Sequence, residues 1–535
     1  MGLYVNPGNI AFAEVNDSDY VDKTLLIDNV NRTIGKGGNL ICNSRLRRSG
    51  KSWAARMLVA YYDASCDSHP LFDDKKIALC DGYLEHLNRY NVIYLEITSF
   101  ISQARREGMT LKQVPDLIVK TLSKELDALY PSLPKDDTLS GKLISVTEMD
   151  GRRFIFVIDE WDAVIREGKN DPDAHTAYLE LLREWFKNGI FTPKVVAAAY
   201  MTGILPIKKD GSQSAISDFC EYTMIKPGKF APFIGFTEDE VIRLCASYHA
   251  DFTQMKRWYD GYEFSSVGAV YNPNSVMKAL QNGDFDSYWT ETSAAEGLIE
   301  YISQDYNGLT KTVAELIGGI DVSVETAGFA NDLTSFKGKD DVLTLMIHLG
   351  YLAYNAVTRT VRIPNEEIKR EFQRSIHVVR HTATLKRLKQ SEDLFLATIR
   401  KDEAKVAEAI EKIHAEETAP LHYNMEQSLR SVIKLAYYTY RDHYLQFEEL
   451  PSGSGYADVV YIPLPDSDWP PLVIELKWNK SAEGAIEQIE KKNYPKVLEN
   501  INRPVLLVGI TYDRDQESGK RKHSCRIVEY RMDES

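Results

Sequence analysis

A short segment near the start of the chain constrains the fold more than any other feature. Residues 44–52 read Ser-Arg-Leu-Arg-Arg-Ser-Gly-Lys-Ser, after the apolar run 40–42 and before an Ala-rich amphipathic stretch at 53–62. This order predicts a strand, a tight loop and a helix. In such a loop the backbone N–H groups and the helix N-terminus hold the phosphates of a nucleotide.

The loop contains a compact set of expected nucleotide ligands. Lys51 is expected to reach the β- and γ-phosphates, and the Ser52 hydroxyl to coordinate Mg²⁺. The usual pattern has a glycine five residues before Gly50, where this chain has Arg45. Gly-Lys-Ser alone also fits the start of an ordinary helix, so other features must support the site. The expected ligands in this loop are Arg48, Ser49, Gly50, Lys51 and Ser52.

A second motif follows about a hundred residues later. Residues 154–158 are five consecutive apolar residues, which is typical of a strand buried on both faces of a parallel sheet. Asp159 and Glu160 follow at its C-terminal end, where open α/β sheets bind their ligands. Asp159 is expected to hold Mg²⁺ through its water shell, and Glu160 to polarise the attacking water. The alternative is a strand that ends in a solvated acidic turn, but the two motifs together are more specific than either alone.

Strands and helices alternate over the first part of the chain, which predicts an α/β fold with a parallel, doubly wound sheet. Thr202 follows one of these strands and is expected either to sense the γ-phosphate or to cap the turn. The further predicted strands are 91–96 and 195–200, and the predicted helices are 53–62, 111–130 and 174–188.

From about residue 226 the pattern changes to helices with many aromatic residues. Thr237 and Glu240 form a capping box at the start of one of them. A helix at 343–352 followed by a short hairpin at 360–364 is similar to a winged helix. Residues 385–416 have the pattern of charged, solvated helices.

The C-terminal part contains a second candidate site. Glu426 lies in the first turn of a helix, and the segments 456–462 and 472–478 read as a hairpin centred near residues 466–467. This centre places Asp458 directly opposite Glu475, with Cβ atoms about 5 Å apart, close enough to share one cation. Lys477 lies on the same face as Glu475 because strand periodicity is two.

Two carboxylates, a cation and a lysine can activate water for phosphodiester hydrolysis. The alternative is a surface ion pair between Glu475 and Lys477, which contributes little to stability. The apolar neighbours of Glu475 in 472–478 bury this strand, where an isolated charge is costly, and so favour the site. Gln488 and Tyr494 on the next helix face either the same cleft or solvent.

Composition limits the classes of protein that remain. The chain has 535 residues and a formal net charge of −14, which argues against non-specific coating of nucleic acid but permits a local basic groove. No apolar run is long enough for a membrane span, and the N-terminus has no signal-peptide pattern. The six cysteines have no C-x-x-C spacing, which indicates a reduced cytoplasmic protein without zinc.

With both sites identified, the chain resembles a bacterial family of AAA-ATPase-like proteins that carry a C-terminal PD-(D/E)XK nuclease domain. The family loop reads Arg-Pro-Arg-Arg-Phe-Gly-Lys-Ser, so the missing first glycine is a family trait, while Leu46 and Ser49 replace its Pro and Phe. The residues that carry the resemblance are 20–24, 47–48, 50–52, 159–162, 201–203, 258–262, 271–273, Glu426, Asp458, 475–477, Gln488 and Tyr494.

The resemblance implies an N-terminal P-loop NTPase domain with a parallel sheet, a middle helical or winged-helix region, and a C-terminal α/β restriction-endonuclease-like domain. Glu426, Asp458 and Glu475 would be its metal ligands, with Lys477 and Gln488 beside them. The expected boundaries are 1–225 for the ATPase domain, 226–384 for the helical region, 385–420 for a helical linker and 421–535 for the nuclease domain.

The sequence thus predicts an ATPase coupled to a Mg²⁺-dependent nuclease, with ATP and Mg²⁺ as cofactors and Mn²⁺ as an alternative metal. Nucleic acid is the expected partner, DNA before RNA, while self-association stays open and no membrane is expected. One alternative is an ATP-driven switch or remodelling protein whose nuclease-like domain only binds nucleic acid. Another is an interaction protein in which both sites have decayed; the presence of Lys51, Asp159, Asp458, Glu475 and Lys477 argues against it.

Overall fold

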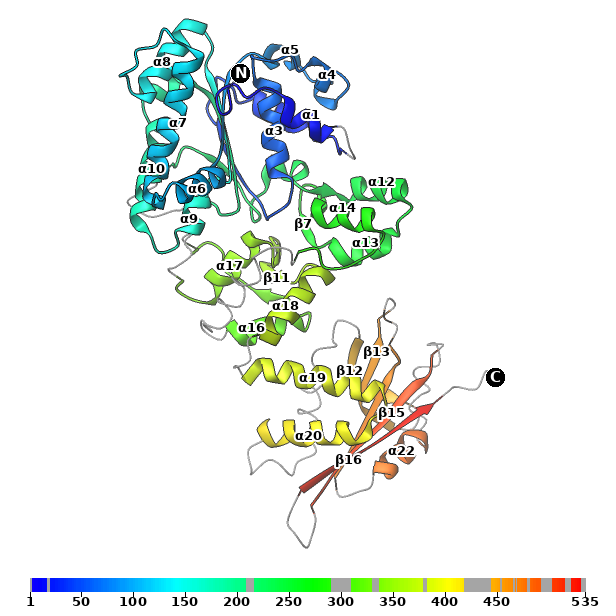
Figure 1. Cartoon of the computed structure of the whole chain (residues 1–535). Helices are drawn as coiled ribbons and strands as arrows, with labels where there is room; N and C mark the ends of the chain where they lie inside the picture. Colours follow the sequence, from blue (N-terminus) through cyan, green and yellow to red (C-terminus); the bar gives the residue numbers. More distant parts are fainter. Residues whose placement is uncertain are drawn as a thin grey trace. The chain divides into compact units, whose positions relative to one another are not determined.

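The computed structural model divides into two compact units, and each is described by itself (Figure 1). The first unit is discontinuous and comprises Met1–Ala294 and Ser323–Glu371; the second comprises Ala295–Val322 and Phe372–Ser535. The residues described are 2–16, 20–207, 216–289, 309–329, 336–378, 383–417, 444–452, 455–464, 467, 469–478, 482–491, 503–514 and 521–530.

A five-stranded parallel sheet lies at the centre of the first unit, with strand order β2-β3-β4-β1-β5. All residues of β1, β3 and β4 are buried, as expected for strands covered on both faces. The prediction of a parallel α/β sheet is therefore confirmed. The strands are β1 (Leu40–Ser44), β2 (Asn91–Glu96), β3 (Phe154–Asp159), β4 (Val196–Gly203) and β5 (Cys220–Tyr222).

Successive residues of β3 point into two different cores. Phe154, Phe156 and Ile158 pack on one face of the sheet, whereas Ile155 and Val157 pack on the other. Figure 1 shows α7, α8 and α10 on one side of the sheet and α1 and α3 on the other. The helices are α1 (Ile10–Asn16), α2 (Leu25–Asn31), α3 (Lys51–Tyr62), α4 (His69–Phe72), α5 (Tyr83–His86), α6 (Ile97–Arg106), α7 (Val114–Leu129), α8 (Leu139–Asp150), α9 (Ala163–Glu167), α10 (Pro172–Phe186) and α11 (Phe191–Val195), with short 3₁₀ turns at Lys76–Leu79 and Leu111–Gln113.

The rest of the first unit consists of helices and two small antiparallel sheets. One sheet has the order β6-β8-β7 and the other β10-β11-β9. The predicted capping box at Thr237 and Glu240 is present, as are a helix and hairpin close to the predicted 343–352 and 360–364. The elements are a 3₁₀ helix (Gly228–Phe233), β6 (Phe236–Thr237), α12 (Glu238–Tyr248), α13 (Phe252–Tyr259), β7 (Tyr262–Phe264), β8 (Gly268–Tyr271), α14 (Pro273–Asn282), α17 (Lys339–Leu349), β10 (Ala353–Asn355) and β11 (Thr360–Arg362). Two further elements, β9 (Val322–Ser323) and α18 (Glu366–Val378), cross the boundary between the units.

The second unit is built on a mixed five-stranded sheet of order β12-β13-β14-β15-β16. All neighbours are antiparallel except β14 and β15, which are parallel and are joined through α22. The elements are α16 (Leu309–Ile317), α19 (Ala383–Ile399), α20 (Glu403–Glu417), β12 (Tyr444–Ser452), β13 (Gly455–Pro463), β14 (Leu472–Trp478), α22 (Ala482–Lys491), β15 (Val505–Arg514) and β16 (Arg521–Tyr530).

The expectation that residues 385–416 form solvated helices is wrong in one respect. Phe395 of α19 and Ile410 of α20 are almost fully buried in one core with Ile474 and Val508 of the sheet. Exposed charged residues such as Asp393 and Glu408 are interspersed with these buried positions, so the charge pattern predicted full exposure of both helices. The predicted domain boundaries stay predictions, and the helix expected to carry Glu426 lies outside the described residues.

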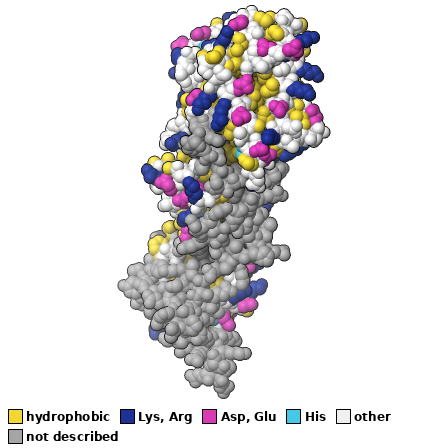
Figure 2. Space-filling view, turned by 90° about the vertical axis from the view of Figure 1, so that its left-hand side faces the viewer, with side chains coloured by type: hydrophobic (Ala, Val, Ile, Leu, Met, Phe, Trp, Pro, Cys, Tyr) yellow, Lys and Arg dark blue, Asp and Glu magenta, His cyan; other side chains and the backbone are white. Residues whose placement is uncertain are grey.

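Two general properties of the surface bear on the class of protein. Among the described helices, none is both long and apolar enough to cross a bilayer. On the face of the first unit seen in Figure 2, basic and acidic side chains alternate and do not form a broad patch of one sign.

Candidate functional site

The loop after β1 turns sharply into α3, as the sequence predicts. Gly50 adopts φ 91°, in the left-handed region that glycine reaches without strain, and stands immediately before Lys51, the first residue of α3. The Lys51 Nζ donates a hydrogen bond to the carbonyl of Leu46 (2.8 Å), and the Ser49 hydroxyl donates to the same oxygen (2.8 Å). Burial lowers the pKa of Lys51 to about 8, although Glu160 and Asp159 act in the opposite direction. The lysine is thus held inside the loop it would use to bind phosphate.

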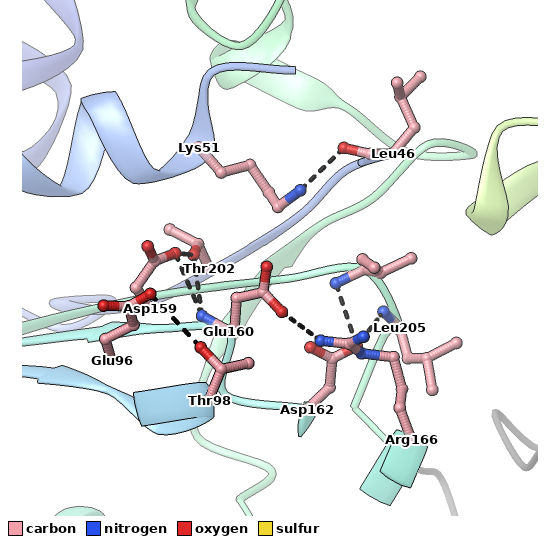
Figure 3. A network of polar contacts seen from close by, with 11 residues as sticks. Leu46, Lys51, Glu96, Thr98, Asp159, Glu160, Asp162, Arg166, Thr202 and Leu205 are labelled. Carbon is pink, nitrogen blue, oxygen red and sulfur yellow. Dashed lines mark hydrogen bonds and ion pairs between the residues drawn. The ribbon is translucent and has the colours of Figure 1, made fainter. Parts of the chain in front are cut away.

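Asp159 lies at the end of β3 within reach of the start of α3. Its carboxylate accepts hydrogen bonds from the hydroxyls of Thr202 and Ser52. Burial raises the pKa of Asp159, and these two hydroxyls counteract part of that rise. Glu96 pairs in register with Asp159 at the end of β2 and accepts a hydrogen bond from the Thr98 hydroxyl (3.4 Å) (Figure 3). The strand ends therefore bring a carboxylate beside the hydroxyl expected to coordinate Mg²⁺.

Glu160 has an unusual backbone conformation for a residue with a side chain. Its φ is 53°, and its N–H is held by Asp159 Oδ1 (3.1 Å) and by the Thr202 hydroxyl (3.3 Å). Such left-handed geometry costs about 1–3 kcal/mol and persists where the surroundings enforce it, often at functional sites. The Glu160 carboxylate accepts a hydrogen bond from Arg166 Nη2 in α9 (Figure 3).

Thr202 links the two acidic residues. Its hydroxyl donates to Asp159 and lies within hydrogen-bond distance of the Glu160 N–H, while its carbonyl accepts from the N–H of Trp161 (2.9 Å). This arrangement fits the turn-capping alternative directly, because the hydroxyl fixes the turn that carries Glu160. Contact of Thr202 with a γ-phosphate stays a prediction.

A cavity of about 560 Å³ connects these residues with the helical part of the first unit. Its volume suits a nucleotide-sized ligand, since small-molecule sites typically occupy about 300–1,000 Å³. One end contains the loop and Glu160, and the remaining wall is partly aromatic and apolar. The lining residues include Arg48, Ser49, Gly50, Lys51, Ser52 and Glu160 at the loop end, and Tyr20, Phe236, Met277 and Lys278 on the other walls.

The second candidate site lies in the sheet of the second unit. Val459 pairs with Ile474 and Tyr461 with Leu472, which confirms the predicted register over these residues. One further step in the same register would set Asp458 opposite Glu475, and this opposition stays a prediction. The Asp458 carboxylate accepts a hydrogen bond from the N–H of Leu476 (2.8 Å).

The Glu475 side chain is almost fully buried and its carboxylate has charged and polar neighbours. Oε1 accepts a hydrogen bond from Lys477 Nζ (2.8 Å) and another from Gln488 Nε2 of α22. Of the two options for Gln488, the one in which it faces the site is thus the observed one. The exposed fraction of Glu475 is 1%, so the surface ion pair considered from the sequence does not describe this residue. Glu426 and Tyr494 lie outside the described residues.

Comparison with known proteins identifies the part of the chain that carries the first site. Residues 9–212 match the family described as "Predicted AAA-ATPase". This range includes the loop at 44–52, the end of β3 and Thr202. The N-terminal part of the chain is an AAA-ATPase-like domain. The match ends before the second unit and gives no information on Asp458 or Glu475.

Other resemblances are more distant. An uncharacterized protein encoded in the vnfD 5′ region of Azotobacter chroococcum mcd 1 is 23% identical over 406 residues, which is 72% of this chain and 73% of that protein. The Walker-type ATPase PABY2304 of Pyrococcus abyssi has a TM-score of 0.32 at 12% identity, covering 66% of this chain and 94% of that one. The Aeropyrum pernix ORC2 protein has a TM-score of 0.30 at 12% identity, covering 69% and 97%. The last two resemblances are only partial, with both TM-scores below 0.5.

The AAA-ATPase-like domain contains a suitable pair of groups for Mg²⁺. Mg²⁺ in nucleotide sites is held by one or two protein oxygens together with phosphates and waters, so the Ser52 hydroxyl and the Asp159 carboxylate fit it. Among the described residues, there is no cluster of three or more His, Cys, Asp or Glu side chains that could bind a metal without phosphates or waters as further ligands. For the second unit this leaves Asp458 and Glu475, with Glu426 outside the described residues.

Two residues of the AAA-ATPase-like domain were not recognised from the sequence. Arg166 is one of them, although its i,i+4 spacing from Asp162 could have indicated an ion pair between the two side chains. Arg45 is the other: it replaces the usual glycine, has an exposed fraction of 1%, and lies 4.6 Å above the Phe264 ring. Burial lowers the pKa of Arg45, and within the described part of the chain its Nε and Nη2 have no hydrogen-bond partner. Its side chain therefore joins the phosphate loop to β7.

Proposed function

We propose that the AAA-ATPase-like domain binds and hydrolyses ATP in the presence of Mg²⁺. The observation that carries this proposal is the shared cavity: Lys51, Ser52 and Glu160 line it together, and Ser52 is hydrogen-bonded to Asp159. The residues come from the strand–loop–helix unit of β1 and α3 and from the end of β3, which is separated from β1 by β4. Phosphate-binding loops use such a combination of a loop and an acidic strand end.

Each side chain has a defined task in this proposal. Lys51 exchanges the Leu46 carbonyl for the β- and γ-phosphates, while Ser52 and Asp159 hold Mg²⁺, which neutralises developing charge on the phosphates. Glu160 takes the proton of a water whose oxygen forms the new bond to the γ-phosphorus. The bond from that phosphorus to the bridging oxygen breaks, and its electron pair leaves with ADP.

The test separates binding from hydrolysis. Lys51→Ala should abolish ATP binding, because it removes the buried cation of the loop, whereas Glu160→Gln should bind ATP without hydrolysing it. Titration calorimetry and phosphate release measure the two effects. Unchanged ATP affinity in the Lys51 variant would refute the assignment of residues 44–52 as a phosphate-binding loop. These residues would then form only the start of an ordinary helix.

For the second unit we infer a metal-dependent nuclease that acts on nucleic acid, DNA before RNA. The register of β13 and β14 supports it, because one further step would set Asp458 opposite the buried Glu475, and two facing carboxylates repel one another without a cation. Lys477 lies beside them and would stabilise charge developing on a phosphodiester. Glu426 would complete the Mg²⁺ or Mn²⁺ ligands.

The decisive experiment is a nuclease assay on DNA and RNA, with and without ATP and Mg²⁺. Asp458→Ala should remove cleavage, and Mg²⁺ or Mn²⁺ should raise the Tm of the wild type more than that of Asp458→Asn. Lys477→Ala should retain the metal effect on Tm and lose activity. Glu483→Gln, an exposed change on α22, is the matched control and should cleave normally.

One observation favours the alternative of a nuclease-like domain that only binds nucleic acid. The Glu475 carboxylate already accepts hydrogen bonds from Lys477 and Gln488, which satisfies part of its charge without a metal. Nucleic-acid binding with no metal-dependent cleavage in any condition would support this alternative and overturn the nuclease.

A further inference from the structure

Glu160 lines the cavity and lies among cationic side chains. Arg166 donates to its carboxylate, and Lys51 and Arg47 are both close enough to feel its charge. Burial lowers the pKa of Arg47, and the Arg166 guanidinium adds to that, whereas Glu160 opposes both. One carboxylate thus serves as counter-ion for several cations beside the phosphate loop.

Arg166 is fixed at one end of its guanidinium. Its Nε donates to Asp162 Oδ2 (3.0 Å), and the same oxygen accepts the N–H groups of Ile204 (3.1 Å) and Leu205 (2.8 Å) after β4 (Figure 3). Asp162 is fully buried, so this anchor is shielded from solvent. Burial alone would lower the pKa of Arg166, but Asp162 and Glu160 raise it above its ordinary value.

The other end of the Arg166 guanidinium contacts Glu160, whose carboxylate a bound nucleotide would repel. Nη2 donates to Glu160, and Glu160 lines the same cavity as Lys51. A γ-phosphate bound at Lys51 carries about two negative charges and would repel the Glu160 carboxylate. A guanidinium presents several N–H groups in a plane, so its terminal nitrogen can donate to a phosphate oxygen in place of a carboxylate oxygen.

We propose that Arg166 recognises the γ-phosphate of a bound nucleoside triphosphate, exchanging Glu160 for the phosphate while Asp162 retains the Nε end. The exchange releases Glu160 to accept a proton from water. A diphosphate lacks this phosphate and leaves the Arg166–Glu160 pair intact. The inference rests on the proposed nucleotide binding and adds a residue of this same chain that distinguishes triphosphate from diphosphate.

The test is the ratio of affinities of the full chain for the β,γ-imido analogue of ATP and for ADP, both with Mg²⁺, measured by titration calorimetry. Arg166→Ala should lower this ratio about tenfold or more, with the ADP affinity unchanged, because it removes charge-assisted hydrogen bonds to the γ-phosphate alone. Arg105→Ala is the matched control: it removes an exposed ion pair to Glu167 of the same helix (2.6 Å) and should leave the ratio unchanged.

A second variant works even if Arg166→Ala fails to fold. Glu160→Gln removes the competing charge on Arg166 and should raise the affinity for the triphosphate analogue several-fold without changing that for ADP. A purely structural ion pair would not produce this gain. Failure of the wild type to bind either nucleotide would refute the proposed function itself. Binding of both, with a ratio that neither Arg166→Ala nor Glu160→Gln changes, would overturn only the role of Arg166.

Discussion

At the scale of single residues, the burial of two cationic side chains in the phosphate loop leads to predictions for nucleotide affinity and for stability. Lys51 is almost fully buried and donates to a backbone carbonyl, and Arg45 is held between the loop and an aromatic ring. Burying a cation without a partner costs free energy of folding. We therefore expect a pH effect at Lys51 and an effect of removing the charge at Arg45.

Nucleotide affinity should fall as the pH rises above about 8. Burial lowers the pKa of Lys51 to about 8 in the free protein, and bound phosphates favour its charged form. Above that pH the lysine must take up a proton to bind, so affinity should fall by up to about tenfold per pH unit. The phosphates themselves stay ionised in this window.

Calorimetric titrations with ADP from about pH 7 to about pH 9.5 check this prediction, with proton uptake measured in two buffers. Lys278→Met removes another lysine from the wall of the same cavity and should leave the pH dependence in place. A flat affinity over this range would show that Lys51 does not titrate there.

Arg45 should tolerate loss of its charge but not loss of its volume. Arg45→Met removes a buried guanidinium that has few hydrogen bonds and keeps the packing on Phe264, so the Tm should stay equal or rise. Arg45→Ala should cost about 2–5 kcal/mol because it leaves a cavity. Equal destabilisation of both variants in thermal unfolding would indicate that the charge itself stabilises the loop.

At the scale of elements, sequence patterns predicted the features that depend on the order of neighbouring residues. They missed the features that depend on contacts between residues far apart in the chain. The apolar run at 154–158 and the hairpin centre near residues 466–467 specified β3 and the pairing of β13 with β14, because side-chain alternation leaves one register. The contacts of Arg166 with Asp162 and Glu160 were not predicted, since they depend on Asp162 meeting the backbone after β4. The buried faces of α19 and α20 were missed because their charged residues dominate the composition.

The hairpin of β7 and β8 should be sensitive to substitution at its start. Gly261 adopts φ 117°, and a Cβ there would lie 2.1 Å from the carbonyl oxygen of Pro364. Gly261→Ala should therefore destabilise the first unit by more than about 2 kcal/mol, from backbone strain plus the clash. Gly268, at φ 79° with open space around it, provides the control.

Gly268→Ala should cost only the strain of the left-handed conformation, about 1–2 kcal/mol. Denaturant unfolding of both variants gives the difference, which isolates the contact with Pro364. Similar losses at the two positions would mean that the backbone near Pro364 moves to relieve the clash.

At the scale of the whole molecule, the first unit is assembled from two separate stretches of chain. The stretch that begins at Ser323 includes Gly350, which packs closely on Leu46 of the phosphate loop. It also includes Glu367, whose carboxylate accepts a hydrogen bond from the Ser275 hydroxyl (3.0 Å). The AAA-ATPase-like match at 9–212 contains the proposed nucleotide-binding residues but neither Gly350 nor Glu367.

A fragment of residues 1–294 should therefore lose nucleotide binding even though it contains the whole candidate site. It lacks the contacts of Leu46, Gly261 and Ser275 with the later stretch, and its Tm should be about 10 °C or more below that of fragment 1–371. Thermal unfolding with and without the ATP analogue measures both properties. Equal stability and affinity of the two fragments would show that the later stretch is dispensable.

The discontinuity of the first unit also sets an order of events during synthesis. Lys51 is made early, but the residues that brace its loop follow about three hundred positions later, after the segment Ala295–Val322 of the second unit. At about 5–20 residues per second, a nascent chain spends tens of seconds with the phosphate loop built and its supports missing. During this interval the loop lacks the packing of Gly350 on Leu46, so we expect the proposed nucleotide binding only after part of the second unit has already been translated.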